Sequence, residues 1–149
     1  MLKFKKGDLV SAFIDNEVNV FGHQANCMKV MGAGIALQVK KRLPELYAAD
    51  QMTLKSVRKL GTFSYHIYPR GIAFNLYGQG NFGRDKCYTD YDAVRMALRG
   101  LAHKLRNKQA TARIGLSKLG CSLAGGDWAI VQQIIEEELQ CFDVTIYSI

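Results

Sequence analysis

The sequence lacks any hydrophobic run long enough to cross a membrane. No stretch approaches the roughly 18 consecutive apolar residues that a transmembrane helix needs. The N-terminal segment also lacks the apolar core of a secretory signal, because Lys3, Lys5, Lys6 and Asp8 interrupt its hydrophobic residues. We therefore expect a cytoplasmic protein with no membrane partner.

Closely spaced metal ligands are missing as well. The four cysteines are far apart along the chain, and the three histidines are equally scattered. The ligand spacing of a zinc site is therefore absent, and we expect neither a metal nor a cofactor. Without a secretory signal, reduced thiols are favoured over disulfides.

Length and composition are those of one folded domain, which we expect to span residues 1–149. The 149 residues are 48% hydrophobic and 22% charged, which excludes a disordered chain and provides an ordinary core. The 20 Lys and Arg outnumber the 13 Asp and Glu, which gives a net charge of +7 and a pI near 9.3. This excess favours a polyanionic partner such as nucleic acid or a phosphate-bearing ligand, although a solvated basic surface explains it equally well.

Short β-rich runs alternate with helical patterns. We predict strands over residues 2–5, 18–23, 62–67, 72–77, 112–116 and 144–147, the second of them central in the sheet. Apolar residues at helical spacing predict helices over 35–43, 91–105 and 130–139, with Pro44 closing or restarting the first. Thr89 and Asp92 match a capping box for the second helix. This order predicts an α/β fold with a parallel or mixed sheet, and a ligand beyond the carboxyl ends of the strands.

A glycine-rich turn from strand to helix is the most informative stretch. It runs from His23 through Asn26 to Gly32-Ala33-Gly34-Ile35-Ala36. Glycine lets backbone amides approach a ligand closely, and a helix N-terminus adds unpaired N–H groups and partial positive charge. Such a turn suits a phosphate, but a tight corner without a ligand also explains it.

A second glycine-rich turn spans residues 120–128 and likewise follows a predicted strand and opens a helix. We expect the two turns to face each other across one cleft and to hold a diphosphate together. Neither turn has the Lys-Ser/Thr ending of a P-loop, and no acidic residue stands where a Rossmann dinucleotide site needs one. Binding of a nucleotide triphosphate and hydride transfer with NAD are therefore disfavoured.

The whole pattern resembles the macro domain, the ADP-ribose-binding family. The matching segments are Lys6-Gly7-Asp8-Leu9, residues 23–26 and 31–36, Gly120-Cys121 with Leu123, and Thr145-Ile146-Tyr147-Ser148-Ile149. The sequence is most similar to the branch that includes ADP-ribose 1''-phosphate phosphatases and terminal ADP-ribose protein glycohydrolases, found in bacteria and phages. This resemblance implies a three-layer α/β/α fold with a central mixed sheet. It also implies a monomer that acts on ADP-ribose or on an ADP-ribosylated protein or nucleic acid.

The resemblance further implies which residues bind the ligand. Asp8 would accept a hydrogen bond from the adenine amino group, and Leu9 and Ile149 would lie beside the base. A plain turn with Gly7 also explains Asp8. The other implied ligand-binding residues are Gln24, Ala25, Asn26, Met31, Gly32, Ala33, Gly34, Ile35, Ala36, Lys118, Leu119, Gly120, Cys121, Ser122, Leu123 and Ala124.

Three residues are candidates for catalysis. Asn26 matches the position that holds the distal ribose or the attacking water in related domains, and its amide can both donate and accept. His23 is a candidate general acid or base, with a core histidine as the alternative. Asp127 is a candidate for orienting or deprotonating water, with a helix N-cap as the alternative.

The sequence departs from the glycohydrolase pattern at two positions. The family's aspartate is replaced by Ala124, and its nucleophilic lysine would fall near Gly78 or Gln79, with Lys86 later in the same loop. A covalent lysyl mechanism is therefore not expected. Ser122 also replaces a frequent glycine, which either narrows the phosphate loop or adds a donor.

The glycine-interrupted loop 78–86 is a candidate lid. In it, Phe82 would stack on the distal ribose and Arg84 would pair with a terminal phosphate. A plain surface loop is the alternative.

Three classes of function remain. The leading hypothesis is a hydrolase of ADP-ribose derivatives, either a phosphatase or an enzyme that removes ADP-ribose from macromolecules, in which the backbone amides of both turns stabilise negative charge. The second is an ADP-ribose-binding module without turnover. The third, a nucleic-acid-binding protein, rests on the net charge and on Lys40-Lys41-Arg42, but basic and aromatic residues do not interleave on one element.

Overall fold

A six-stranded mixed sheet forms the centre of the molecule. The computed structural model describes residues 2–83, 85–121 and 124–149. The strands follow the order β1-β6-β5-β2-β4-β3, and every neighbouring pair is parallel except β3 and β4. Their bounds are β1 (Leu2–Lys6), β2 (Val20–Asn26), β3 (Phe63–Tyr68), β4 (Gly71–Gln79), β5 (Arg113–Leu116) and β6 (Asp143–Ser148). The predicted strands are confirmed, and β2 is central as expected.

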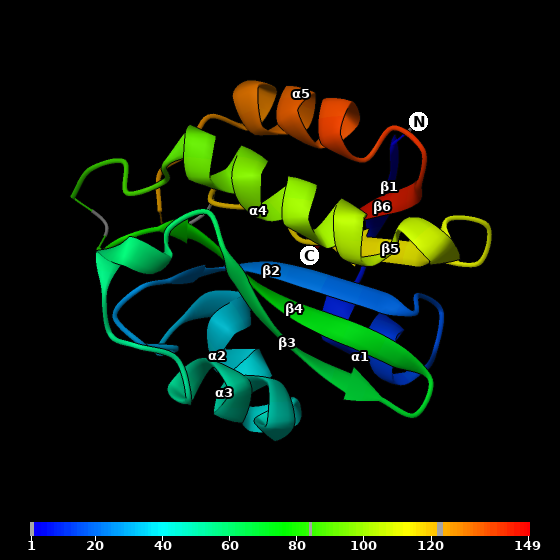
Figure 1. Cartoon of the computed structure of the whole chain (residues 1–149), viewed down its shortest axis with the longest axis horizontal. Helices are drawn as coiled ribbons and strands as arrows, with labels where there is room; N and C mark the ends of the chain where they lie inside the picture. The colour runs from blue at the N-terminus through cyan, green and yellow to red at the C-terminus, as the bar shows by residue number, and fades with distance from the viewer. Residues whose placement is uncertain (1, 84, 122–123) are drawn as a thin grey trace.

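Helices cover both faces of the sheet, which confirms the three-layer α/β/α architecture. In Figure 1, α4 and α5 lie over one face, and α1, α2 and α3 lie over the other. The helices are α1 (Leu9–Ile14), α2 (Gly34–Arg42), α3 (Pro44–Gln51), α4 (Tyr91–Lys104) and α5 (Trp128–Glu138), with short 3-10 turns η1 (Val57–Lys59) and η2 (Arg106–Lys108). Pro44 restarts the chain as α3, because proline suits the first turn of a helix.

Each face of the sheet has its own core. Alternate residues of a strand point to opposite faces, so Val20 packs under α4 and α5 while its neighbour Phe21 packs under α1, α2 and α3. Burial on both faces explains why β2 is nearly apolar up to its last residues. Polar residues at its carboxyl end are therefore exceptions that need partners or a role.

The N-cap of α4 differs from the prediction. Asp90, not Thr89, accepts a hydrogen bond from the backbone N–H of Ala93 (3.0 Å). Thr89 instead donates its hydroxyl to the carbonyl of Gly120 (2.8 Å). Aspartate is as strong a cap as threonine, so sequence alone could not choose between adjacent candidates.

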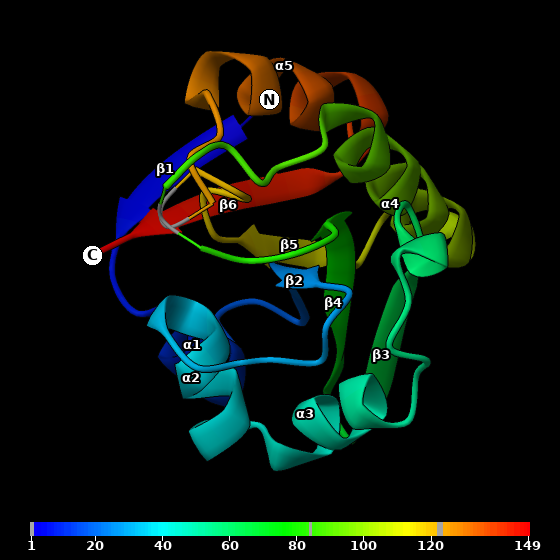
Figure 2. The ribbon, with the colours of Figure 1, turned by 90° about the vertical axis from the view of Figure 1, so that its left-hand side faces the viewer.

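The carboxyl ends of the parallel strands meet at one edge of the molecule. Figure 2 looks onto this edge, where the segments that follow β2, β4 and β5 lie in front of the sheet. No helix within the described ranges is both long and apolar enough to span a bilayer.

Candidate functional site

A cavity of about 1180 Å³ opens at this edge of the sheet. Segments that follow β1, β2, β4, β5 and β6 all contribute to its wall. Both glycine-rich turns line it, through Gly32 to Ala36 on one side and Gly120, Cys121 and Ala124 on the other. The prediction that two distant turns share one cleft is confirmed.

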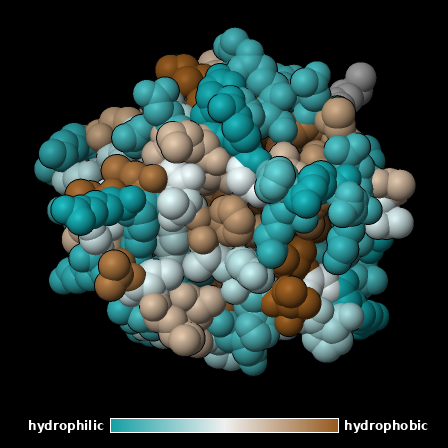
Figure 3. Space-filling model, in the orientation of Figure 1, coloured by the Kyte–Doolittle hydropathy of each residue, from teal (hydrophilic) through white to brown (hydrophobic). Residues whose placement is uncertain are grey.

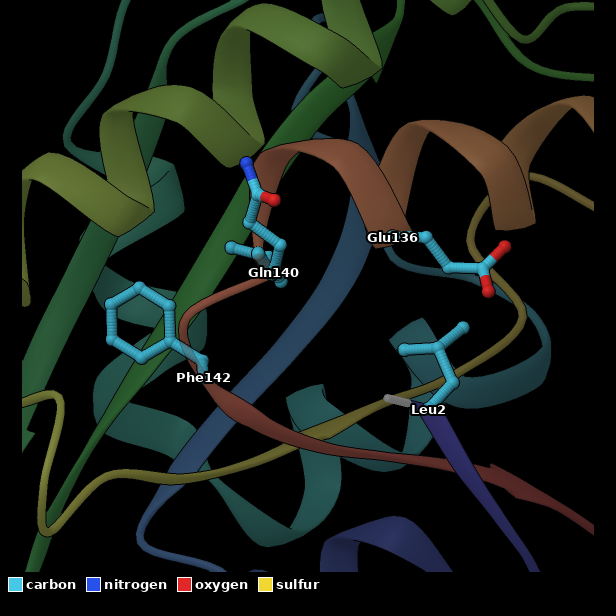
Figure 4. A pocket seen from close by; sticks show the side chains of 5 residues that line it. Leu2, Glu136, Gln140 and Phe142 are labelled. Carbon is cyan, nitrogen blue, oxygen red and sulfur yellow. The ribbon is translucent and has the colours of Figure 1, made fainter.

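A second hollow, between the start of β1 and the end of α5, is far smaller. Leu2, Glu136, Leu139, Gln140 and Phe142 line its volume of about 170 Å³ (Figure 4). Ligand pockets typically measure about 300–1,000 Å³. The large cavity is therefore the candidate site.

The N-terminus of α2 is arranged to receive an anion. Its N-cap residue, Ala33, makes no side-chain capping bond, whereas α1, α4 and α5 are each capped by an aspartate, Asp8, Asp90 and Asp127. The first backbone N–H groups of α2 are thus left for whatever occupies the cavity, and they carry the positive end of the helix dipole. Gly34 begins the helix with φ of 58°, a left-handed conformation that favours glycine.

The opposite turn is held by hydrogen bonds to its backbone. The carbonyl of Gly120 accepts from the backbone N–H of Gly126 (2.6 Å) and from the Thr89 hydroxyl (2.8 Å). The N–H of Tyr88 donates to the carbonyl of Ala124 (2.7 Å). These bonds join the segment before α4 to the turn before α5, of which Gly120, Cys121 and Ala124 line the cavity.

Asp8 lines the cavity and also caps α1. Its Oδ1 accepts from the backbone N–H of Ser11 (3.2 Å), and its Oδ2 pairs with Arg42 (2.8 Å). Partial burial alone would raise the pKa of Asp8, but the hydrogen bonds from Ser11 and Arg42 outweigh it and lower this pKa. The carboxyl is therefore an ionised acceptor at neutral pH, and the capping alternative holds together with exposure to the cavity.

Asn26 lines the cavity, but its amide mainly shapes the loop that follows β2. Oδ1 accepts from the N–H groups of Met28 (2.9 Å) and Val30 (3.3 Å), and Nδ2 donates to the carbonyl of Val30 (2.8 Å). Lys29 lies inside this loop with a left-handed φ of 63°. Asn26 therefore sets the entrance of the cavity next to α2.

His23 is not available as a general acid or base, so this prediction is wrong. Its side chain is fully buried and absent from the cavity wall. Nε2 donates to Oδ1 of Asn75 (2.6 Å), and Nδ1 has no partner among the described residues. Burial lowers the pKa of His23 against the opposing effects of Asn75 and Asp50, so the ring stays neutral in the core.

Asp127 caps α5 and does not line the cavity. Its Oδ1 accepts from the N–H of Ala129 (2.9 Å) as the N-cap of α5, and the residue lies outside the cavity wall. The alternative interpretation as a helix cap is correct.

The other predicted ligand-binding residues divide into three groups. Leu9, Gln24, Ala25, Lys118 and Ile149 line the cavity together with the residues named above. Met31 and Leu119 do not, because both are buried in the two cores. Ser122, Leu123 and Arg84 lie outside the described residues.

Several wall residues were not predicted as ligand-binding residues. They are Gly7, Val10, Val30, Leu37, Gln38, Gln79, Gly83, Ser117, Tyr147 and Ser148. Most of them directly adjoin a predicted residue at a strand end or lie one step further along α1 or α2. Strand-end position was therefore the signal that could have found them. Phe82, which we considered as part of a lid, is half-exposed and also lines the cavity.

The wall offers few groups for acid–base or nucleophilic chemistry. Burial, aided by Asp127, raises the pKa of Cys121 to about 11, which leaves a neutral thiol at pH 7. The Lys118 ammonium lies over the ring of Trp128, 5.5 Å from its centroid. Across the described ranges, no three His, Cys, Asp or Glu side chains are grouped to hold a metal ion.

Comparison with known proteins places the chain among macrodomains in sequence and in fold. It is 30% identical to an uncharacterized 17.5 kDa protein from the tk-vs intergenic region of Enterobacteria phage T4, over 98% of this chain and 95% of that protein. A DNA ADP-ribosyl glycohydrolase of Thermus aquaticus is 28% identical over 96% of this chain, which spans only 39% of that enzyme. The macrodomain of Mycobacterium tuberculosis DarG superposes with a TM-score of 0.81 at 25% identity, covering 100% of this chain and 98% of that one. No protein-family model matches.

Proposed function

We propose, because this chain belongs to the macrodomain family, that its cavity binds ADP-ribose and that the protein is a hydrolase of ADP-ribose derivatives. One observation carries the proposal: residues 32–36, with the uncapped N-terminus of α2, line the same cavity as Gly120, Cys121 and Ala124. The first backbone N–H groups of α2 suit a phosphate, and a diphosphate would extend from them toward Gly120 and Cys121 on the opposite wall.

The remaining wall supports a proposal for the rest of the ligand. Asp8, ionised and beside Leu9, offers an acceptor for the adenine amino group. The distal ribose would then point toward Asn26, Gln79 and Phe82, at the ends of β2 and β4. Its anomeric carbon C1'' is where hydrolysis would occur, either of a 1''-phosphate or of the bond to a modified macromolecule.

The proposed reaction is direct attack by water: the water oxygen bonds to C1'', the bond from C1'' to the phosphate or the macromolecule breaks, and the proton released from water neutralises the departing group or passes to solvent. By resemblance to the family, Ala124 would replace the aspartate of a covalent mechanism, and Gly78 or Gln79 its lysine. None of these side chains can act as a base or a nucleophile. The preorganised backbone amides at α2 would hold the diphosphate in place and so fix the position of C1'' for the attack. The net charge of +7 supports a substrate carried on nucleic acid, in line with the DNA-directed activity named for the Thermus aquaticus relative.

A binding module without turnover is the second candidate. It is favoured by the composition of the wall, since Asp8 is the one acidic side chain among the described residues that line the cavity, and it is paired with Arg42. Such a module would hold ADP-ribose with the same contacts and release nothing.

The proposal also covers domain organisation, oligomeric state and cellular location. We propose a single macrodomain over residues 1–149 that acts as a monomer in the cytoplasm. Support comes from four free cysteines and from the mostly hydrophilic face in Figure 3, where hydrophobic residues are scattered.

Two assays test the proposal. Isothermal titration with ADP-ribose should show binding. A Kd of about 1 mM corresponds to a binding free energy of only about −4 kcal/mol, so the absence of binding at about 1 mM ADP-ribose would refute the proposal. Release of phosphate from ADP-ribose 1''-phosphate, and of ADP-ribose from a modified DNA oligonucleotide, then separates enzyme from reader. Binding without either release would favour the reader.

A further inference from the structure

The carboxamide of Gln24 lies where three segments of the cavity wall meet. Gln24 is near the carboxyl end of the central strand β2 and itself lines the cavity. Its Nε2 donates to Oε1 of Gln79 (2.8 Å), which ends β4, and to Oγ1 of Thr89 (3.1 Å), just before α4. One amide group therefore ties the central strand to partners 55 and 65 residues away in the sequence.

From Gln24, the hydrogen bonds continue into two loops. Toward the glycine turn, the Thr89 hydroxyl donates a hydrogen bond to the carbonyl of Gly120 (2.8 Å). Toward the loop after β4, Nε2 of Gln79 donates to the carbonyl of Asn81 (2.8 Å), whose Oδ1 accepts from the N–H of Phe82 (2.8 Å). Because an amide NH₂ can only donate, both branches have a fixed direction that starts at Gln24.

The surrounding backbone leaves space for this side chain. A Cβ at Gly78 would lie 2.5 Å from Oε1 of Gln24, and one at Gly120 would lie 2.7 Å from the same atom. Oε1 is buried between them with no partner among the described residues. The two glycines therefore leave room for the carboxamide whose hydrogen bonds join β2 to both segments.

We propose that Gln24 is a positioning residue that couples the Gly120 turn to the 79–82 loop around the distal half of the ligand. The inference rests on the proposed function and deepens it. Gln24 would not touch reacting atoms; it would hold both loops at the spacing that the second phosphate and the distal ribose require. Preorganised loops lower the ordering cost of binding.

This role makes a selective prediction. The adenine end of the cavity, at Asp8 and Leu9, receives no hydrogen bond from either branch. Loss of Gln24 should therefore weaken ligands that reach the distal half and spare those that do not. AMP ends at the first phosphate and serves as the short probe, whereas ADP-ribose spans both halves.

The test is titration of the full chain with ADP-ribose and with AMP. Gln24→Met keeps the side-chain length and removes the donor; we expect ADP-ribose to bind about tenfold more weakly and AMP to change by less than about threefold. Gln133→Met, at an exposed position on α5, is the matched control and should change neither. The coupling role would be overturned if Gln24→Met lowered the affinity for ADP-ribose and for AMP by the same factor, or if it lowered neither affinity.

A second pair of variants keeps the test decisive if Gln24→Met fails to fold. Thr89→Val is isosteric and breaks the branch to Gly120, so it should weaken ADP-ribose selectively, whereas Thr89→Ser keeps the hydroxyl and should restore binding. If Thr89→Val binds ADP-ribose like the wild type, the inference is wrong even though the proposed function stands. If the wild type binds no ADP-ribose, the proposed function fails and the inference falls with it.

Discussion

Some side chains around the cavity bind nearby backbone groups and also line the cavity. Asp8 caps α1 while facing the cavity, and Asn26 shapes the loop after β2 while lining it. The resemblance to the macro domain identified these residues, which lie at the carboxyl ends of β1 and β2. It did not reveal the partners that set their chemistry, such as Arg42, which lies 34 residues from Asp8.

Substitutions at Asp8 can separate its two roles, as the N-cap of α1 and as the proposed acceptor for the adenine amino group. Asp8→Ala should lower the free energy of unfolding by about 1 kcal/mol, because the N-cap of α1 is lost. Asp8→Asn keeps a good cap and should retain most of that stability. Both variants should weaken ADP-ribose by about tenfold or more, since the charged acceptor for the adenine amino group is gone. Urea unfolding and titration measure the two effects, and unchanged affinity in Asp8→Asn would contradict the adenine assignment.

His23 should make folding sensitive to mild acid. Its pKa is lowered by burial in the folded state, whereas the unfolded chain binds a proton near pH 6.5. The unfolded state therefore gains protons first, and stability should fall as the pH drops from 7 toward 5.

His23→Gln should reduce that slope, because a glutamine can still donate to Asn75 and has no proton to gain. Urea unfolding at several pH values measures it, with His103→Gln at an exposed position as the control. An unchanged slope in His23→Gln would show that another group is responsible.

At the scale of elements, periodicity predicted the strands and the long helices well. It missed α1 as a helix, because its six residues are too few to show a helical period. The capping-box pattern placed the N-cap of α4 one residue early. Short elements and caps depend on local hydrogen bonds between neighbouring candidates, which the sequence pattern leaves open.

The start of α2 offers a matched pair of glycines. Gly34 has φ of 58°, so Gly34→Ala forces a left-handed alanine and should cost about 1–2 kcal/mol of stability. Gly32 has no positive φ, and an added Cβ would meet only a Val30 methyl at 3.8 Å, so Gly32→Ala should be tolerated. Urea unfolding of both variants checks this, and equal loss in the two would mean that the backbone of Gly34 is not the cause.

For the whole molecule, the site depends on contacts that no local pattern records. The alternation of strands and helices predicted the layers and the edge where ligands bind. The order β1-β6-β5-β2-β4-β3, which brings residues 32–36 to the same cavity as Gly120 and Cys121, comes from packing across the sheet. The burial of His23 likewise depends on Asn75, 52 residues later. The sequence therefore predicted the wall of the cavity better than it predicted the catalytic residues.

The central claim is that two distant backbone turns hold one ligand between them. Hydrogen–deuterium exchange of the full chain, with and without saturating ADP-ribose, tests it most directly. We expect slower exchange of amides both in residues 32–36 and in residues 120–121 at the same ligand concentration. Protection confined to one turn, or absent from both while ADP-ribose is bound, would contradict the claim.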